Sequence, residues 1–324
     1  MEIFKQQKIF DFVRWSKYGL IASILLTLAS FYLFFGVGFN LGIDFAGGST
    51  AQIQYTQQNA PMAEIRKLLA TDERFKNAQV SRFGVDNEII IKIPFNENLK
   101  ANEIDTTLHT LLESSGEFSI RKLDTVGPKV GDELRKSAIL SLVLATIAMM
   151  AYVSFRYEWR FALASIIALV HDIVITAASV IIFKIDLNLE VIAALLTLLG
   201  YSINDTIIIF DRIREKMLEG KKMNANEVIN EAVSSTLTRT TLTSLTMFFV
   251  VLTLYLFGGQ IIVGFSLPLL VGVVFGTYSS MFVAPKLAIL LNFSVEAYYA
   301  KEVQKAKKQE EKKRMRQLYE GGRV

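Results

Sequence analysis

Six apolar segments, each about 20 residues long with few or no charges, dominate the pattern of the chain. At about 1.5 Å of rise per residue, a helix of that length crosses a hydrocarbon core of about 30 Å. The pattern therefore predicts an α-helical membrane protein with six transmembrane helices. The expected spans are residues 18–38, 137–155, 161–183, 187–210, 236–257 and 261–283.

The polar segment between the first two spans has a different pattern, typical of a small folded domain. The strand-like stretches are 51–57, 80–85, 88–93 and 118–123. One helix is expected to open at Pro61, with Asn59 or Ala60 at its cap, and a second helix over 99–115. The pair Asp86-Asn87 predicts the turn of a hairpin. The order β-α-β-β-α-β predicts one ferredoxin-like α+β domain between transmembrane helices one and two.

The placement of charge predicts how the chain crosses the membrane. Basic residues precede the first span (Lys5, Lys8, Arg14 and Lys17), and Arg156 and Arg160 follow the second span. Because positive loops stay inside, we expect both termini in the cytoplasm and residues 39–136 in the periplasm. No cleavable signal peptide is expected, since the first apolar run is long enough to span.

This topology divides the chain into four parts. They are a cytoplasmic N-terminus with the first span (1–38), the periplasmic domain (39–136), a five-helix bundle (137–291) and a basic cytoplasmic tail (292–324). Between the fourth and fifth spans, residues 212–235 predict an amphipathic cytoplasmic connector. Its apolar positions are Ile213, Met217, Val228 and Val233.

Composition narrows the function classes. The chain is 52% hydrophobic with a net charge of +4, and its mean hydropathy is +0.36. Lys and Arg gather at helix ends and in the tail, so the charge is a topology signal and no nucleic acid is required as a partner. There is no cysteine, and the two histidines, His109 and His171, lie far apart. We therefore expect no metal site and no cofactor, and a plain surface or half-buried role for His109.

The tail from Lys301 to Val324 holds nine Lys or Arg against four Glu. It is too polar to bury, so we expect a frayed helix or a disordered segment. A solvated positive-inside segment is the preferred interpretation. Contact with anionic lipid or with ribosomal RNA stays open as an alternative.

The fourth span carries a carboxylate, Asp205, at membrane depth. It lies six residues before Asp211, about 9 Å deeper along the helix axis. An acid placed there costs a few kcal/mol at least, so it marks a functional site by default. We expect it to load and release a proton, and the alternative is a permanent interhelical hydrogen bond. The expected supporting polar cluster is Tyr201, Ser202, Asn204, Thr206 and Thr240.

Two further charged positions lie within or near the apolar spans. Arg239, beside Thr240 near the inner end of the fifth span, is the candidate cation for Asp205, and snorkelling to the interface is an equal alternative. Asp172 lies midway through the third span and serves as a second proton site or as a structural hydrogen-bond acceptor. Adjacent helical residues point about 100° apart, so we expect no mutual pair between His171 and Asp172.

Glycines in the sixth span predict close helix packing. Gly272 and Gly276 form a GxxxG pair, which is a helix-contact signal of low specificity.

Five motifs, in this order, carry a resemblance to a known family. They are GIDFAGGS (42–49), VGPKVGDEL (126–134), YEWRFALASIIALVHD (157–172), GYSINDTIIIFDRIRE (200–215) and SSTLTRTTLTSLT (234–246). The set resembles the SecF proteins of the bacterial SecD/SecF family of protein-export membrane proteins, within the RND superfamily. The family-motif residues are Gly42, Asp44, Gly47, Gly48, Gly127 and Pro128.

The resemblance implies a six-span half of a pseudo-symmetric transporter that pairs with SecD in the bacterial cytoplasmic (inner) membrane. Its implied partners are the SecYEG channel, YajC and the unfolded preprotein. The complex would use the proton-motive force, with protons as the coupling ion, to assist preprotein translocation and late release. Asp205 and Arg239 match the two family positions assigned to proton transfer. The chain holds only the SecF half, so a second aspartate would come from SecD.

Three alternatives compete with a proton-driven subunit. A non-transporting scaffold that holds partners at the channel predicts that Asp205→Asn has no effect. A membrane-embedded enzyme is disfavoured, because the sequence offers no nucleophile–base pair, metal-ligand set or phosphate loop. A small-molecule exporter of the RND type would usually carry larger outer domains and both membrane halves in one chain.

Overall fold

The structure, a computed structural model, describes residues 8–219 and 224–320. Within these residues, six helical runs are long and apolar enough to cross a membrane. They are α1 (Phe12–Gly36), α5 (Pro128–Arg156), α6 (Trp159–Ile182), α7 (Leu189–Glu219), α8 (Ala225–Phe257) and the run formed by α9 (Gly259–Tyr278), a π-helical turn (Ser279–Val283) and α10 (Ala284–Leu290). All six predicted spans are confirmed, and most of the helices extend beyond the apolar segments.

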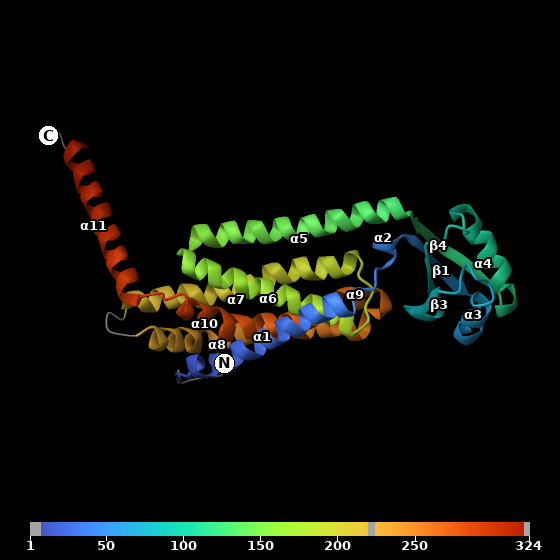
Figure 1. Cartoon of the computed structure of the whole chain (residues 1–324), viewed down its shortest axis with the longest axis horizontal. Coiled ribbons are helices and arrows are strands. Elements are labelled where there is room, and N and C mark those ends of the chain that lie inside the picture. Colours follow the sequence, from blue (N-terminus) through green and yellow to red (C-terminus); the bar gives the residue numbers. More distant parts are fainter. Residues whose placement is uncertain (1–7, 220–223, 321–324) are drawn as a thin grey trace.

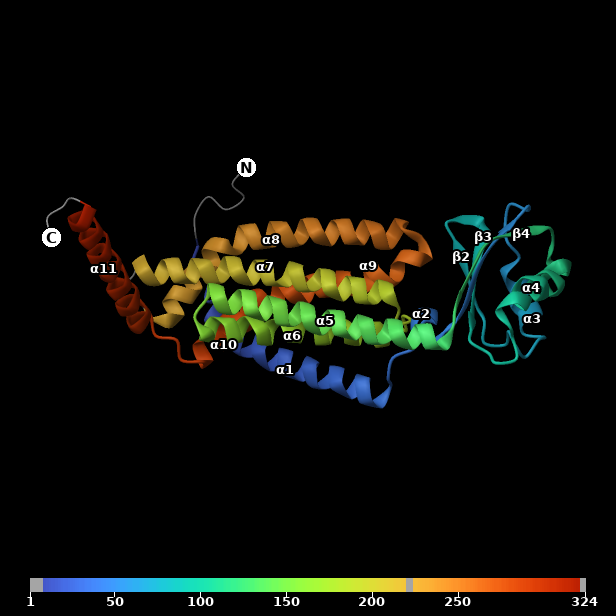
Figure 2. The ribbon, with the colours of Figure 1, turned by 90° about the horizontal axis from the view of Figure 1, so that it is seen from above.

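The long helices lie side by side along the long axis of the molecule, with a small domain at one end (Figures 1 and 2). The first described residues and the tail helix α11 (Val295–Glu320) lie at the opposite end (Figure 1). The predicted connector is formed by the ends of α7 and α8. Its four predicted apolar residues are all fully buried there. Lys5 lies outside the described residues, as do residues 220–223 and 321–324.

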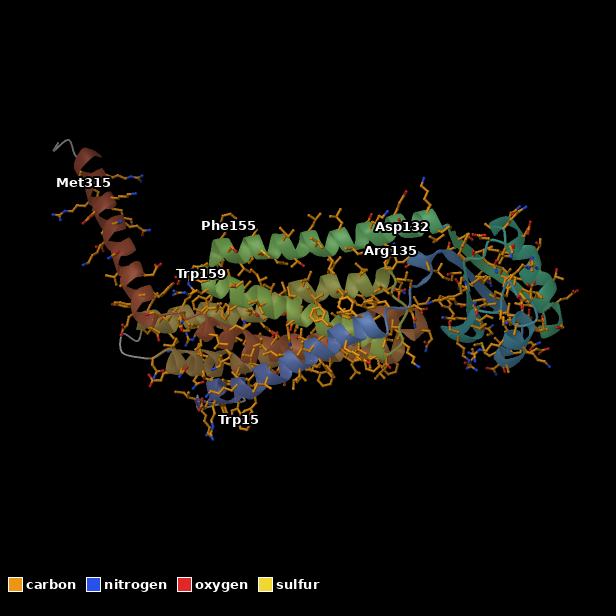
Figure 3. The ribbon with its side chains drawn as sticks, in the orientation of Figure 1. Trp15, Asp132, Arg135, Phe155, Trp159 and Met315 are labelled. Carbon is orange, nitrogen blue, oxygen red and sulfur yellow. The ribbon has the colours of Figure 1, made fainter. Side chains whose placement is uncertain are left out.

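Exposed aromatic side chains mark one end of the bundle. Trp15, Phe155 and Trp159 lie at the end that also carries the termini, and Asp132 and Arg135 lie at the end next to the small domain (Figure 3). Trp is enriched where apolar helices meet the water interface. The Asp132–Arg135 ion pair, at 2.6 Å, sits in the polar layer at the other end. The apolar helix surface between the exposed aromatic residues at one end and the Asp132–Arg135 ion pair at the other is therefore the part that faces lipid.

The small domain follows the predicted order. It comprises β1 (Gly48–Tyr55), α3 (Met62–Leu69), β2 (Gln79–Phe83), β3 (Val85–Pro94), α4 (Ile104–Leu112) and β4 (Phe118–Val126), with 3-10 turns at Ala101–Glu103 and Glu113–Ser115. The sheet order is β2-β3-β1-β4 with antiparallel neighbours, which confirms the ferredoxin-like plan. Helices α3 and α4 cover the face turned away from the bundle (Figure 1). Ile53, Ile91 and Leu108 are among the buried residues between sheet and helices.

Two local predictions in this domain are wrong. The hairpin turns at Gly84, whose φ of +67° suits glycine, and not at Asp86-Asn87, which lie inside β3. The strand accommodates both side chains, because Asp86 pairs with Arg82 at 2.6 Å and Asn87 donates to the Tyr55 carbonyl. Helix α3 begins at Met62 with Pro61, rather than Asn59 or Ala60, at the cap position. His109 is exposed and stacks on Phe118, as expected for a surface histidine.

The GIDFAGGS segment contains a short helix, α2 (Ile43–Ala46), followed by Gly47 and Gly48 with φ of +82° and +144°. The tail, expected to be a frayed helix or disordered, is helical over α11 and projects from the bundle (Figure 1).

A matched pair of glycine substitutions tests the packing at the base of the domain. A Cβ on Gly48 would lie 2.3 Å from the Ile93 carbonyl oxygen, whereas a Cβ on Gly84 would meet nothing within 4 Å. Both positions have positive φ, so each alanine adds backbone strain of about 1–3 kcal/mol. We expect Gly48→Ala to lower the midpoint of thermal unfolding of the purified protein clearly more than Gly84→Ala. Equal shifts for the two variants would contradict this packing.

Candidate functional site

Two carboxylates are buried inside the bundle, Asp172 on α6 and Asp205 on α7. Their exposed fractions are 0% and 1%. Helix α7 takes part in both sites, because Ser202 and Asp205 lie three residues apart and reach different neighbours. The two sites are therefore adjacent along α7, but Ser202 contacts Asp172 of α6 whereas Asp205 contacts Ser244 of α8.

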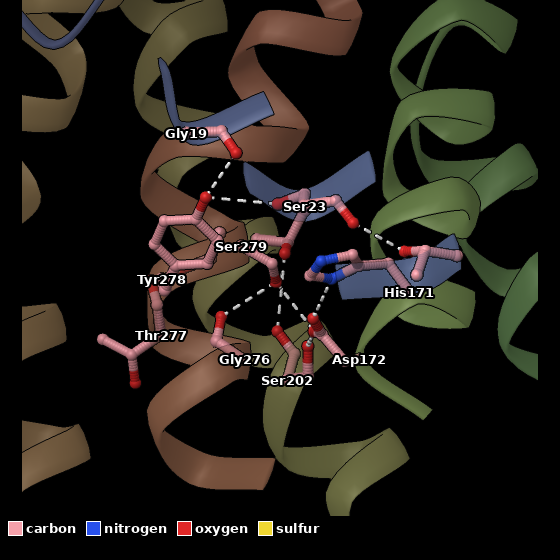
Figure 4. A network of polar contacts seen from close by, with 12 residues as sticks. Gly19, Ser23, His171, Asp172, Ser202, Gly276, Thr277, Tyr278 and Ser279 are labelled. Carbon is pink, nitrogen blue, oxygen red and sulfur yellow. Dashed lines mark hydrogen bonds and ion pairs between the residues drawn. The ribbon is translucent and has the colours of Figure 1, made fainter. Parts of the chain in front are cut away.

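The Asp172 carboxylate joins three helical elements (Figure 4). Its Oδ2 accepts hydrogen bonds from Ser202 Oγ of α7 at 2.5 Å and from Ser279 Oγ of the π-helical turn at 2.7 Å. Its Oδ1 lies 2.9 Å from Nδ1 of His171. A buried carboxylate needs such donors, since no water solvates it. Asp172 therefore holds α6, α7 and α9 together at one point.

The expectation that His171 and Asp172 do not pair is wrong. The 100° rotation between adjacent residues fixes the directions of their Cα–Cβ bonds, but both side chains turn back toward each other beyond Cβ. Nδ1 is the ring nitrogen nearer the backbone, so it reaches the neighbouring carboxylate. The other ring nitrogen, Nε2, is buried without a hydrogen-bond partner among the described residues.

Glycines on α9 bring the helices into contact around this network. A Cβ on Gly276 would lie 3.3 Å from Cβ of Ser202 and 3.6 Å from Oδ2 of Asp172. One on Gly272 would lie 2.7 Å from Leu198 of α7. The GxxxG pair thus packs α9 against α7, as predicted.

The last residue of α9, just before the π-helical turn, also connects the site to α1. This residue, Tyr278, donates to the Gly19 carbonyl at 2.5 Å and accepts from Ser23 Oγ at 3.2 Å (Figure 4). The adjacent residues Tyr278 and Ser279 therefore link α1 on one side to the Asp172 network on the other.

Asp205 has a sparser environment. Its Oδ2 accepts one hydrogen bond, from Ser244 Oγ of α8 at 3.2 Å, and its Oδ1 has no partner in the described part of the chain. Ser244 in turn lies 2.7 Å from Thr277 Oγ1 of α9. One oxygen of a buried carboxyl group is thus left without a donor at the junction of α7, α8 and α9.

Arg239 does not contact Asp205. It lies on the exposed side of α8 and makes no side-chain hydrogen bond or ion pair with any described residue, although its charge acts on Asp205 through space. Thr240 is fully buried, and its hydroxyl oxygen is unpartnered in the described region. Arg239 and Thr240 therefore point to different sides of the helix.

The predicted supporting cluster is only partly assembled. Thr206 is buried and donates to the Ser202 carbonyl at 3.4 Å, and Tyr201 is half-buried with an unpartnered hydroxyl. Asn204 is exposed and does not join the cluster, which corrects the prediction. Its neighbour Asp205 faces the bundle, and a rotation of about 100° turns Asn204 outward. The family-motif residues lie elsewhere, around the junction between domain and bundle.

Sequence reasoning missed three partners of the two acids, His171, Ser244 and Ser279. It also missed Thr277, which donates to Ser244 and not to an acid. A hydroxyl in a membrane helix commonly bonds to its own backbone, so its type carries little information about a distant partner. Among the described residues, no group of three His, Cys, Asp or Glu is placed to hold a metal ion.

Six helices long and apolar enough to span, with one ferredoxin-like domain between the first two, define an integral membrane protein with two buried acids in its helical bundle. A family model described as "Protein export membrane protein SecD/SecF, C-terminal" matches residues 107–294, and "SecD/SecF GG Motif" matches residues 32–58. The chain belongs to the SecD/SecF family of protein-export membrane proteins.

Relatives and solved structures agree with this assignment. "Protein translocase subunit SecF" of Helicobacter pylori strain J99 is 61% identical over 324 residues, which is 100% of both chains. The protein of that name from Vibrio alginolyticus is 36% identical and covers 94% of this chain and 96% of its own. The crystal structure of SecDF, a translocon-associated membrane protein from Thermus thermophilus, matches with a TM-score of 0.77 and 32% identity.

The match to SecDF covers 90% of this chain and 39% of the SecDF chain. A second SecDF structure, titled as a super-membrane-facing form, has a TM-score of 0.66. The protein is thus a membrane protein of the bacterial inner membrane with a role in Sec-dependent protein export. Its relatives are named as translocase subunits, which is a transport function and not a catalytic one.

Two substitutions at Asp172 test how far its network supports the fold. Asp172→Ala removes three hydrogen bonds, each worth about 0.6 kcal/mol on average in membrane proteins, so we expect a loss of about 2 kcal/mol of stability. Asp172→Asn can accept from both serines and donate to His171, but more weakly than a carboxylate accepts, so it should lose clearly less stability than the Ala variant. The midpoint of thermal unfolding in detergent measures both. An Asn variant as unstable as the Ala variant would contradict the network.

Proposed function

We propose that this chain is the SecF subunit of a SecD–SecF complex that uses the proton-motive force to assist preprotein translocation and late release. The observation that carries the proposal is the Asp205 carboxyl group, which is buried between three helices and has one oxygen without a donor among the described residues. A proton arriving at Oδ1 would neutralise a charge that costs free energy in this environment. Protons are then the coupling ion, and the mechanism needs no other cofactor.

Proton transfer at Asp205 would change how α7 packs. The neutral and ionised carboxyl groups bind Ser244 differently, so the junction of α7, α8 and α9 has two states of unequal energy. Asp172 is proposed as a second proton site, because protonation would weaken its hold on Ser202 and Ser279. Helices α7 and α9 would then shift against each other, and the outer domain would follow.

Arg239 is proposed to assist as a mobile cation. It lies outside direct contact with Asp205 but has no other ion-pair partner in the described residues, so no bond holds it where it is. A guanidinium group that approaches Asp205 in one state and withdraws in the other would favour loss and gain of the proton in turn. Thr240 and Tyr201 offer unpartnered hydroxyls nearby for the same path.

SecD is the proposed partner in the membrane. A stripe of α7 at membrane depth presents Thr197, Gly200 and Asn204 outward, and the charged Arg239 is exposed on the neighbouring helix. Polar and small residues at such a depth favour contact with other helices over contact with lipid. A second membrane half, carrying an acid of its own, fits this face. We further propose the SecYEG channel, YajC and the unfolded preprotein as partners.

The orientation follows from the same proposal. We place both termini in the cytoplasm and the outer domain in the periplasm, because Arg156 and Arg160 lie at the end of the bundle that carries the termini. The tail helix α11 would then extend into the cytoplasm as a solvated basic segment.

The scaffold function is the second candidate. The outer domain and α11 project from opposite ends of the bundle and leave large surfaces for partners (Figure 1). In this case neither buried acid would need to change its protonation.

Substitution of Asp205 decides between the two. Asp205→Asn keeps an acceptor for Ser244 but cannot exchange a proton, so we expect the proton-dependent part of export to fall by about 5- to 150-fold, the range of a typical coupling free energy. The measurement is the export rate of a secreted reporter in cells that depend on this gene. The matched control is Asp211→Asn, on the same helix in an exposed ion pair with Arg156 at 2.9 Å.

Co-purification with SecD should be unchanged in both variants. If Asp205→Asn exports as well as the parent protein, the scaffold function stands and proton coupling through this residue is wrong.

A cross-link tests whether the outer domain must move. Ser81 of β2 and Gln260 of α9 line opposite sides of a cleft of about 710 Å³ between the sheet and the outer ends of the helices. Since the chain has no cysteine, Ser81→Cys with Gln260→Cys can be joined selectively by a short bismaleimide. We expect the joined protein to lose proton-dependent export, while either single variant treated in the same way retains it. Full activity after joining would show that the domain does not need to move against α9.

A further inference from the structure

The segment Gly42–Gly48 touches the outer end of α7 through its backbone. The Gly42 N–H donates to the Leu187 carbonyl at 2.8 Å, and the Leu187 N–H donates to the Asn40 carbonyl at 2.7 Å. Leu41 and Leu187 thus form an isolated parallel bridge just before α7 begins at Leu189. The start of the outer domain is thus hydrogen-bonded to the residues that lead into the helix carrying Asp205.

Asp44 adds a side-chain contact to this junction. Its Oδ2 accepts a hydrogen bond from the backbone N–H of Leu189 at 3.1 Å, from 145 residues away in sequence. The first N–H groups of a helix lack partners within the helix and carry partial positive charge, so a carboxylate there is stabilising. Asn188 supplies the local cap by accepting from Val191 at 3.1 Å. Asp44, in the segment that leads into the outer domain, is therefore a second N-cap of α7.

On the side facing α5, the Gly42–Gly48 segment is packed so closely that an added Cβ would not fit. A Cβ on Gly131 of α5 would lie 2.9 Å from the Phe45 carbonyl oxygen, and one on Gly47 would lie 3.1 Å from Cα of Pro128. An ion pair between Lys92 of β3 and Asp186, at 3.5 Å, joins the sheet to the same loop before α7. Helix α2 is thus enclosed between the starts of α5 and α7, next to the sheet (Figure 1).

We propose that Gly42–Gly48 is a rigid joint that makes the outer domain and the outer end of α7 move as one body, with Asp44 as a positioning residue for α7. The proposal rests on the proposed function, since α7 is the helix that carries Asp205 and Ser202. A shift of α7 against α9 would then be passed directly to the sheet and would change the width of the cleft beneath it.

A disulfide across the joint tests its rigidity. A Cβ on Gly42 would lie 3.5 Å from Cβ of Asp186, within the range of about 3.5–4.5 Å that a disulfide needs. The φ of Gly42 is −73°, which other residues adopt freely. The new Cβ would also lie 3.2 Å from Cβ of Asn188 and from the Leu187 carbonyl oxygen, so these neighbours have to move by a few tenths of an ångström. We expect Gly42→Cys with Asp186→Cys to form the bond in membranes with or without a proton gradient, and the oxidised protein to export as fast as the reduced one. Gly42→Ser and Asp186→Cys alone are the controls.

Two results would overturn the joint. Either the bond fails to form, or it forms and stops export, in which case the junction has to open during the cycle. The yield of the bond does not depend on proton transfer. Failure of the proposed function would therefore appear as a silent Asp205→Asn with the cross-linking yield unchanged, and the two failures remain distinguishable.

Two substitutions of Asp44 test the cap separately, and they do not require a cysteine at Gly42. Asparagine caps helices about as well as aspartate, whereas alanine does not, and the loss corresponds to about a fivefold change in an equilibrium constant. We expect Asp44→Asn to keep export and Asp44→Ala to lower its proton-dependent part about fivefold. In the Ala variant, cross-linking of Ser81→Cys to Gln260→Cys should lose its response to the proton gradient, which a merely structural role would not cause. Equal behaviour of the Asn and Ala variants would refute the cap.

Discussion

The hydrogen bonds around the buried Asp172 carboxylate constrain how the helices of the bundle pack. A carboxylate in a water-free interior has to find donors in protein, and here they come from its neighbour His171, from Ser202 on α7 and from Ser279 in the π-helical turn. The helices must stay within hydrogen-bond distance of each other at this point, and Gly276 leaves the space for it. The hydrogen bonds of Asp172 and the small Gly276 together fix where α6, α7 and the end of α9 cross.

Helix α7 connects this crossing to the rest of the molecule. Its membrane segment carries Ser202 and Asp205. Its N-terminal end, next to the small domain, is bound by Asp44, and the preceding Leu187 is hydrogen-bonded to Asn40 and Gly42. Toward its C-terminal end, Asp211 pairs with Arg156, and Lys216 approaches Glu231 of α8 at 3.7 Å. A change of charge in the middle of such a helix reaches both sides of the membrane without needing a separate relay. Asp205, with fewer partners than Asp172, is the site where that change would cost least in lost contacts.

The spans and the outer domain could be predicted because hydropathy and strand alternation are local properties of the chain. The hairpin prediction failed because two signals competed, and a glycine with positive φ at Gly84 decided against the turn-prone Asp86-Asn87 pair. The prediction for His171 and Asp172 failed because a helical wheel describes where Cβ points, not where a long side chain ends. Asn204 was grouped with Asp205 for its polarity alone, but the helix turns Asn204 to its exposed side, whereas Asp205 and Thr206 are buried.

From its sequence alone, the chain determined its six spans, its ferredoxin-like domain and the two acids that lie in the membrane, because each follows from residue types at fixed spacing. Tertiary structure alone decided which partners those acids have. Ser244, Ser279 and Thr277 stand 33 to 107 residues from the acids or serines they meet, and such contacts depend on how helices rotate and cross. It also decided that Asp44 meets the start of α7, since that contact bridges 145 residues and exists only when domain and bundle are packed together.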